Sequence, residues 1–161
     1  MALQTTGIVT VNRDPESSFA FVQDPLRMAQ CIPGCHDLRE LSPGRWAAIL
    51  TNKVSFITLN FKVVVEVVKV EPPTAISAKI TGESIGLVGR LTATASIELA
   101  PAGPGQTAIR YATDVGLTGK LGGLGQPVFK AKSVQLGAEF AANLKAAMET
   151  SATPPSAEAQ T

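Results

Sequence analysis

Between residues 45 and 115 the chain alternates apolar and polar side chains with a period of two, and this pattern restricts the possible folds most. The alternation is clearest over residues 91–99, where Leu, Ala and Ile alternate with Thr, Ser and Glu. A period of two is typical of a β-strand with one buried face. The other strands predicted in this region cover residues 45–50, 61–70, 76–81 and 109–115. Short connections join them, so we expect an antiparallel sheet.

Helical patterns lie on both sides of this region. Residues 7–12 are rich in β-branched side chains and predict a first strand. Asp14-Pro15 and Asp24-Pro25 each predict the start of a short helix, because Asp caps a helix and Pro suits its first position. Over residues 127–148, apolar side chains recur at helical spacing. This last segment predicts one long amphipathic helix.

The order of these elements predicts the fold class. A sheet with one apolar face must be covered, and only the C-terminal helix is long enough to cover it. We therefore expect an α+β helix-grip fold over residues 1–149: a curved antiparallel sheet wrapped around the long C-terminal helix, with two short helices after the first strand. Residues 150–161 are rich in Thr, Ser, Ala and Pro, and we expect them to be a disordered tail.

The helix-grip arrangement predicts an internal cavity, because a straight helix cannot follow a curved sheet at both ends. Composition agrees, since 45% of the residues are hydrophobic but only 5% are aromatic, so small side chains must fill the interior. Shared faces select the predicted wall residues: Phe61, Val63, Ile80, Leu91, Ile109 and Tyr111 from the strands, with Phe129, Leu136 and Phe140 from the helix. Tyr111 would either donate a hydrogen bond inside the cavity or, more commonly, bond to backbone.

Charge and hydropathy exclude several classes of protein. The net charge is +1 and the Lys and Arg residues are scattered. Nucleic-acid binding needs a basic stripe, so we expect no nucleic-acid partner. No segment approaches the ~18 apolar residues of a membrane span. Residues 1–6 have neither the basic nor the apolar region of a signal peptide, which favours a cytoplasmic protein with reduced cysteines.

The segment Cys31-Ile32-Pro33-Gly34-Cys35-His36 resembles a ligand motif superficially. Its two cysteines are one residue too far apart for a haem-attachment or a C-x-x-C redox motif. A zinc site would need a fourth ligand. We interpret the segment as a tight turn after a helix, with two small buried thiols and no metal.

Catalytic groups are scarce on the predicted apolar face. The chain has one histidine, His36, and no nucleophile pattern surrounds it. The acidic residues of the strands occupy positions that alternate with the apolar ones, so they should point to solvent; these are Glu66, Glu83, Glu98 and Asp114. An acid and base pair would need carboxylates on the other face. We therefore predict no catalytic residue and a protein that is not an enzyme.

Two glycine-rich loops carry large apolar residues. Residues 82–89 hold Leu87 and Val88, and residues 119–125 hold Leu121 and Leu124. The second loop is not a phosphate-binding loop, because Lys120 is followed by Leu and not by Ser or Thr. Apolar side chains in loops are unfavourable unless something covers them. We predict that these four residues form the cavity mouth or a membrane contact.

Several of these segments resemble a known family. They are Cys31-Ile32-Pro33-Gly34-Cys35, Lys69-Val70-Glu71-Pro72-Pro73, Gly82-Glu83-Ser84 and Gly119-Lys120-Leu121. Together they resemble the carbon monoxide dehydrogenase G-subunit family, which belongs to the START-like, polyketide-cyclase-like group of helix-grip proteins. The resemblance covers residues 3–148 and implies the same fold.

The resemblance also implies a function. Members of the family resemble accessory proteins of molybdenum carbon monoxide dehydrogenases or related molybdenum hydroxylases, and are associated with recruiting the enzyme to the membrane. Helix-grip relatives carry apolar ligands, and the mobile electron carrier of the respiratory chain is an isoprenoid quinone, such as menaquinone. The implied protein is non-catalytic, binds a quinone or lipid without a covalent cofactor, and associates peripherally with the inner face of the cell membrane.

Alternatives stay open. The first is a docking adaptor whose cavity is packed shut, and the second is a small cyclase-like enzyme. Many family members carry a C-terminal extension that ends in a membrane-binding segment, whereas this sequence ends at Thr161 in a Pro-, Ala- and Ser-containing tail. Membrane contact would then belong either to the loops or to residues beyond Thr161.

Overall fold

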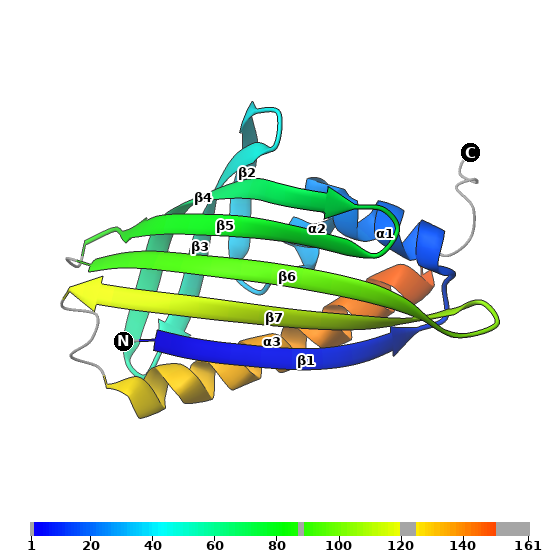
Figure 1. Cartoon of the computed structure of the whole chain (residues 1–161). Helices are drawn as coiled ribbons and strands as arrows, with labels where there is room; N and C mark the ends of the chain where they lie inside the picture. The colour runs from blue at the N-terminus through cyan, green and yellow to red at the C-terminus, as the bar shows by residue number, and fades with distance from the viewer. Residues whose placement is uncertain (1, 87–88, 120–124, 151–161) are drawn as a thin grey trace.

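A computed structural model of the chain describes residues 2–86, 89–119 and 125–150. Strand β1 and the two short helices come first, six strands follow, and the long helix α3 comes last (Figure 1). The elements are β1 (Ala2–Val11), α1 (Pro15–Gln23), α2 (Pro25–Cys31), β2 (Cys35–Ser42), β3 (Arg45–Val54), β4 (Ile57–Glu71), β5 (Ala75–Ser84), β6 (Gly89–Gly103), β7 (Gln106–Gly119) and α3 (Gln126–Thr150).

All seven strands form one antiparallel sheet in the order β1-β7-β6-β5-β4-β3-β2. The sheet is curved, and α3 runs on its concave side, behind β1 and β7 in Figure 1. A register shift between Val67 and Lys69 marks a bulge in the long strand β4, and bulges bend a strand. The predicted helix-grip architecture is confirmed.

The two short helices begin as predicted. The Asp14 carboxylate accepts a hydrogen bond from the Ser17 amide at 2.8 Å, and the Asp24 carboxylate accepts one from the Leu26 amide at 3.0 Å. Each aspartate therefore caps a helix whose first residue is a proline.

One strand of the sheet was not predicted from the sequence, and others are longer than predicted. Residues 35–42 form β2, where we expected only a turn after α2; their polar side chains and irregular pairing with β3 hide any period of two. Strands β6 and β7 extend beyond the predicted residues 91–99 and 109–115, so the turn between them shrinks to Pro104 and Gly105. The apolar pattern marks only the part of a strand that faces the core, and paired backbone continues past it.

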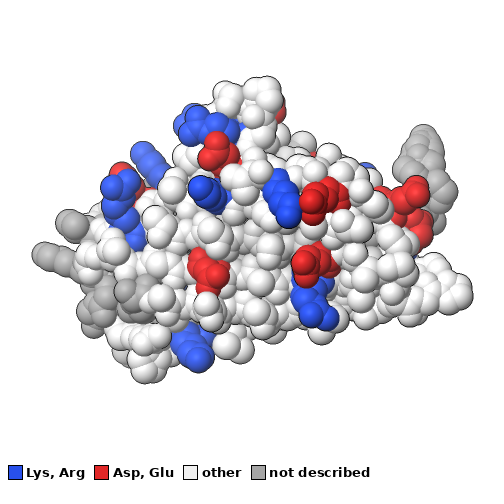
Figure 2. Space-filling model, in the orientation of Figure 1, with Lys and Arg blue, Asp and Glu red and all other residues white. Residues whose placement is uncertain are grey.

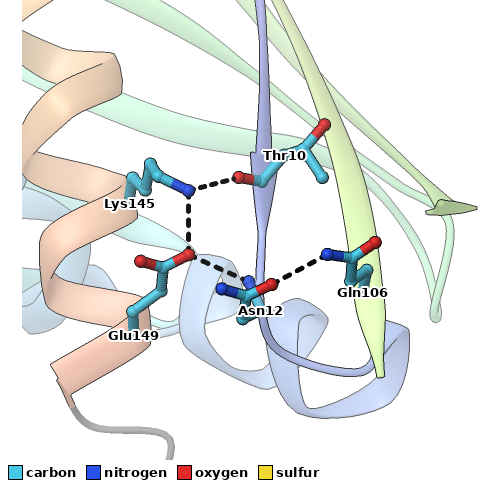
Figure 3. Close-up of polar contacts among 5 residues, drawn as sticks. All are labelled: Thr10, Asn12, Gln106, Lys145 and Glu149. Atoms are coloured by element: carbon cyan, nitrogen blue, oxygen red, sulfur yellow. Dashed lines mark hydrogen bonds and ion pairs between the residues drawn. The ribbon is translucent and has the colours of Figure 1, made fainter. Parts of the chain in front are cut away.

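Helix α3 lies along the edge strand β1 and bonds to backbone groups near both ends of the strand. In an antiparallel edge strand alternate residues point their N–H and C=O groups away from the sheet. Gln126 donates to the Ala2 carbonyl at 3.2 Å and Lys145 to the Thr10 carbonyl at 2.9 Å. The Glu149 carboxylate accepts from the Asn12 amide at 3.1 Å (Figure 3). Side chains of the helix thus take the place of a neighbouring strand at these three backbone groups.

The lengths of the two elements make this pairing possible. From Gln126 to Glu149 a helix rises about 35 Å, at roughly 1.5 Å per residue. From Ala2 to Asn12 an extended strand covers about 33 Å, at roughly 3.3 Å per residue. The two elements therefore stay in step from one end to the other, and α3 is fixed against β1 at both of its ends.

The hydrophobic core has two separate parts. One, the α3-start cluster, contains Leu3, Ala48, Val54, Leu59, Phe61, Val63, Leu117 and Phe129. The other, the α3-end cluster, contains Val11, Phe19, Phe21, Val22, Cys31, Leu99, Ile109, Leu144 and Met148. Helices α1 and α2 close the second cluster but not the first. A region of partly exposed side chains separates the two clusters.

Candidate functional site

The concave face of the sheet is built from small side chains where the two core clusters are separated. The strand register aligns Thr5, Thr113, Ala95 and Ala78 in one row across β1, β7, β6 and β5. None of the four is larger than threonine, none is buried, and none belongs to either cluster. Small side chains on a curved sheet leave space beneath them. We call this row the waist of the sheet.

A hollow of 790 Å³ lies beside the waist, on the side of the α3-start cluster. The next row of the sheet forms its apolar wall: Leu3, Val115, Ala93 and Ile80. Gln126, Lys130 and Ser133 border the hollow from the first turns of α3. A smaller hollow of 200 Å³ adjoins Ala78 and Ala95 of the waist. The larger volume falls within the roughly 300–1,000 Å³ of ligand-binding pockets.

The nine predicted wall residues take three kinds of position. Phe61, Val63 and Phe129 are buried in the α3-start cluster, and Ile80 and Leu91 pack against it. Ile109 is buried in the α3-end cluster, with Phe140 packed against it. Tyr111 and Leu136 are half-buried between the clusters. Of the nine, Ile80 borders the larger hollow.

Tyr111 connects the waist to the middle of α3. Its hydroxyl donates to the Gly137 carbonyl at 3.1 Å, and its ring meets the Phe140 ring edge-on with centroids 5.4 Å apart. A Cβ atom at Gly7 would collide with the Tyr111 hydroxyl, so the glycine makes room for the phenol. The hydroxyl thus bonds to backbone, which is the commoner of the two roles considered for Tyr111.

Polar groups are placed on the helix side of the hollow. Ser133 and Thr5 share a hydrogen bond of 2.5 Å, which uses the hydroxyl of each. Gln126 is committed to the Ala2 carbonyl. The Lys130 ammonium has no hydrogen-bond or ion-pair partner among the described residues. Lys130 is therefore the group at this border that is free to bond to a ligand.

The four residues predicted at the cavity mouth, Leu87, Val88, Leu121 and Leu124, lie outside the described residues. The described residues that flank them, Gly86, Gly89, Gly119 and Gly125, belong to the end of the sheet where α3 begins. The larger hollow lies at that same end, since Gln126 and Leu3 border it.

Of the four acidic residues considered in the sequence analysis, Asp114 borders the larger hollow, as does Lys79, whereas Glu66, Glu83 and Glu98 do not. Glu66, Glu83, Glu98 and Asp114 are all exposed, as their positions in the strands predict. His36 is also exposed and bonds to the Asp37 carboxylate and the Thr51 hydroxyl, both at 2.8 Å. Figure 2 shows charges of both signs scattered over the convex face, with no basic stripe on that face.

The two cysteines lie near the α2–β2 turn. Cys31 is buried in the α3-end cluster and Cys35 is half-buried against the α3-start cluster. Burial raises the pKa of both thiols. Among the described residues, no group of three His, Cys, Asp or Glu side chains could hold a metal ion. Within the same part of the chain, no helix has the length and apolar character needed to span a bilayer.

The sequence marks the waist by small residues at inward-facing strand positions, a pattern that was not used to select the predicted wall residues. In residues 91–99 the two central inward positions are Ala93 and Ala95, with larger residues on both sides. Ala78 lies between Ile76 and Ile80, and Thr113 between Tyr111 and Val115. In any single strand, one or two small inward residues do not predict a hollow. Only the register shows that the small residues fall side by side.

Solved structures share this fold. A conserved protein from Geobacillus kaustophilus is 21% identical, with a TM-score of 0.82, and the match covers 92% of this chain and 96% of that one. A START superfamily protein from Mycobacterium smegmatis is 17% identical with a TM-score of 0.64, covering 91% and 94%. An aromatase/cyclase from a Streptomyces species is 13% identical with a TM-score of 0.62, covering 97% and 96%.

A search of curated protein sequences found no match. The family comparison is more specific. The family model for CoxG, the G-subunit of carbon monoxide dehydrogenase, matches residues 7–149, from β1 through almost all of α3. Three of the four waist residues and three of the four wall residues lie within that range, whereas Thr5 and Leu3 precede it. The chain belongs to the carbon monoxide dehydrogenase G-subunit (CoxG) family.

Proposed function

We propose that this protein carries an isoprenoid quinone or a lipid for a molybdenum carbon monoxide dehydrogenase, or a related molybdenum hydroxylase, at the inner face of the membrane. The hollow of 790 Å³ between the concave sheet and α3 is the observation that carries the proposal. Membership of the family supports the choice of enzyme partner. The cargo is held without a covalent bond.

The walls of the hollow suit an amphiphilic cargo. Leu3, Ile80, Ala93 and Val115 present an apolar surface for the body of the ligand. Lys130, on the opposite side, has an ammonium group with three donors and no partner among the described residues. A quinone carbonyl or an anionic lipid headgroup would accept from it. The arrangement would orient the cargo with its polar end toward the first turns of α3.

The distribution of ionisable side chains favours carriage over catalysis. A cyclase-like reaction would need a general acid or base beside the bound substrate. Of the four carboxylates considered above, Asp114 alone borders the larger hollow, and it is exposed to solvent; His36 is exposed as well and bonds to Asp37 and Thr51. The aromatase/cyclase among the solved structures shares the fold at 13% identity, which says nothing about chemistry here.

A docking adaptor is the second candidate function, and the family match favours it as much as it favours the carrier. The two differ in whether the hollow holds a ligand. Native mass spectrometry of protein purified without detergent tests this directly. The carrier predicts a complex with one quinone or lipid, or binding when a quinone is added. A ligand-free protein that binds no added quinone would refute the carrier and leave the adaptor.

A further inference from the structure

The turn between β3 and β4 carries an aromatic side chain with almost no protein contact. The turn consists of two residues, Ser55 and Phe56, and Ser55 adopts a positive φ of 58°. Phe56 is 95% exposed, more than any other large hydrophobic residue described. Turns of this kind favour Gly, Asn, Asp or Ser, so the turn itself does not require a phenylalanine. Leaving the ring in water is unfavourable.

The turn lies at the end of the molecule where the larger hollow lies, and its flanking residues are packed. Val54 and Ile57, the residues on either side of it, belong to or pack against the α3-start cluster. That cluster also contains Leu3, which borders the hollow, and Phe129 of α3. Figure 1 shows the β3–β4 turn beside the first turn of α3. Phe56 thus projects from a packed support.

Other exposed apolar side chains and free lysines lie at the same end. Ile85 at the end of β5 is 47% exposed, and Val128 in the first turn of α3 is 37% exposed. Lys53 precedes the β3–β4 turn and Lys130 follows Val128; neither has a partner among the described residues.

We infer that this end of the molecule docks on a bilayer with an anionic surface, with Phe56 inserted at the level of the headgroups and Lys53 and Lys130 in contact with them. A ring on a protruding turn fits a soft, deformable surface, and aromatic rings with basic neighbours are the side chains that membrane interfaces accept. The inference rests on the proposed function, because a bilayer at this end supplies an apolar cargo directly to the hollow. These three docking residues are different from the four loop residues predicted at the cavity mouth.

The experiment compares binding to vesicles of two compositions, phosphatidylcholine alone and phosphatidylcholine mixed with phosphatidylglycerol. Phe56→Asp should weaken binding to the mixed vesicles at least about tenfold, because burying a phenylalanine is worth roughly that much. Lys53→Gln should weaken it about fivefold and reduce its dependence on salt. Leu26→Asp is the matched control, because Leu26 is 58% exposed but lies on α2 beside the other core cluster. It should bind as the wild type does.

Binding of a short-chain, water-soluble naphthoquinone without vesicles separates the docking surface from the carrier. The Phe56→Asp variant should bind that quinone as well as the wild type does. Vesicle binding by this variant at the wild-type level would overturn the inference, and so would an equal loss in Leu26→Asp. If the wild type binds vesicles through Phe56 but binds no quinone, the docking surface stands and the carrier function falls.

Discussion

A larger side chain on the wall strand β6 tests whether the hollow is free of protein atoms. Ala93 is half-buried on β6 and points at the hollow, whereas Ala48 is 5% exposed on β3 inside the α3-start cluster. Ala48→Phe forces a ring into packed side chains and should cost about 1–3 kcal/mol. For a domain of this size that lowers the melting temperature by about 2–12 °C. Ala93→Phe finds room, so its free energy of unfolding should stay level or rise by up to about 2 kcal/mol.

The same substitution should obstruct the cargo. A ring that takes about 60 Å² of apolar contact from a bound ligand removes roughly 1.5 kcal/mol, which is a loss of affinity of about tenfold. Urea denaturation and quinone titration measure the two effects on the same samples. If Ala93→Phe is destabilised as strongly as Ala48→Phe, the hollow is closed by packing and our reasoning fails. A stable variant with unchanged affinity would instead place the ligand elsewhere.

Three further predictions concern the supports of the site. Gly7→Ala should destabilise the wild-type protein by more than about 1 kcal/mol, because the new Cβ atom collides with the Tyr111 phenol. In a Tyr111→Ala background the same substitution should cost much less. A double-mutant cycle that shows no coupling between the two positions would contradict this. The hydrogen bonds from Lys145 and from the backbone amide of Asn12 lower the pKa of Glu149. The stabilising effect of the Glu149 carboxylate should therefore be present near neutral pH and fade as the pH falls below the usual glutamate pKa. Melting temperatures of Glu149→Gln, measured over the same pH range, should lose that dependence. Because burial raises the pKa of both thiols, Cys31 and Cys35 should react slowly with iodoacetamide at neutral pH, and the buried Cys31 should react more slowly than Cys35. Changing both cysteines to Ser should leave the metal content at zero. Stoichiometric zinc or iron in the wild-type protein would refute the prediction that the cysteines bind no metal.

The fold was largely predictable because its signals are local. Asp14-Pro15 and Asp24-Pro25 cap helices that form where the sequence places them. The alternation over residues 91–99 marks the face that turns inward. Strand β2 was not predicted because its side chains are mostly exposed, and a strand at the sheet edge needs no apolar face to pair through its backbone.

The site was less predictable because it depends on what meets across strands. Phe61 and Ile109 lie on the inward face, as period two requires, but they fall at opposite ends of the sheet in different clusters. Period two predicts which face of a strand turns inward, but it does not predict which row of that face borders the hollow; the row is Leu3, Val115, Ala93 and Ile80. Ala93 became informative only when the register placed it opposite Val115 and Ile80.

The placement of α3 also limits how copies of the protein could associate. Its side chains bond to the backbone carbonyls of Ala2 and Thr10 and to the backbone amide of Asn12, so a strand that paired along the whole β1 edge would have to displace them. At the opposite edge β2 pairs with β3 alone and its residues are mostly exposed. Backbone pairing between copies is therefore easier at β2 than along the whole of β1. Two chains joined at β2 would each present β1 at an outer edge, and adding a third chain there would break three hydrogen bonds to α3, so the helix disfavours growth of the sheet into a filament.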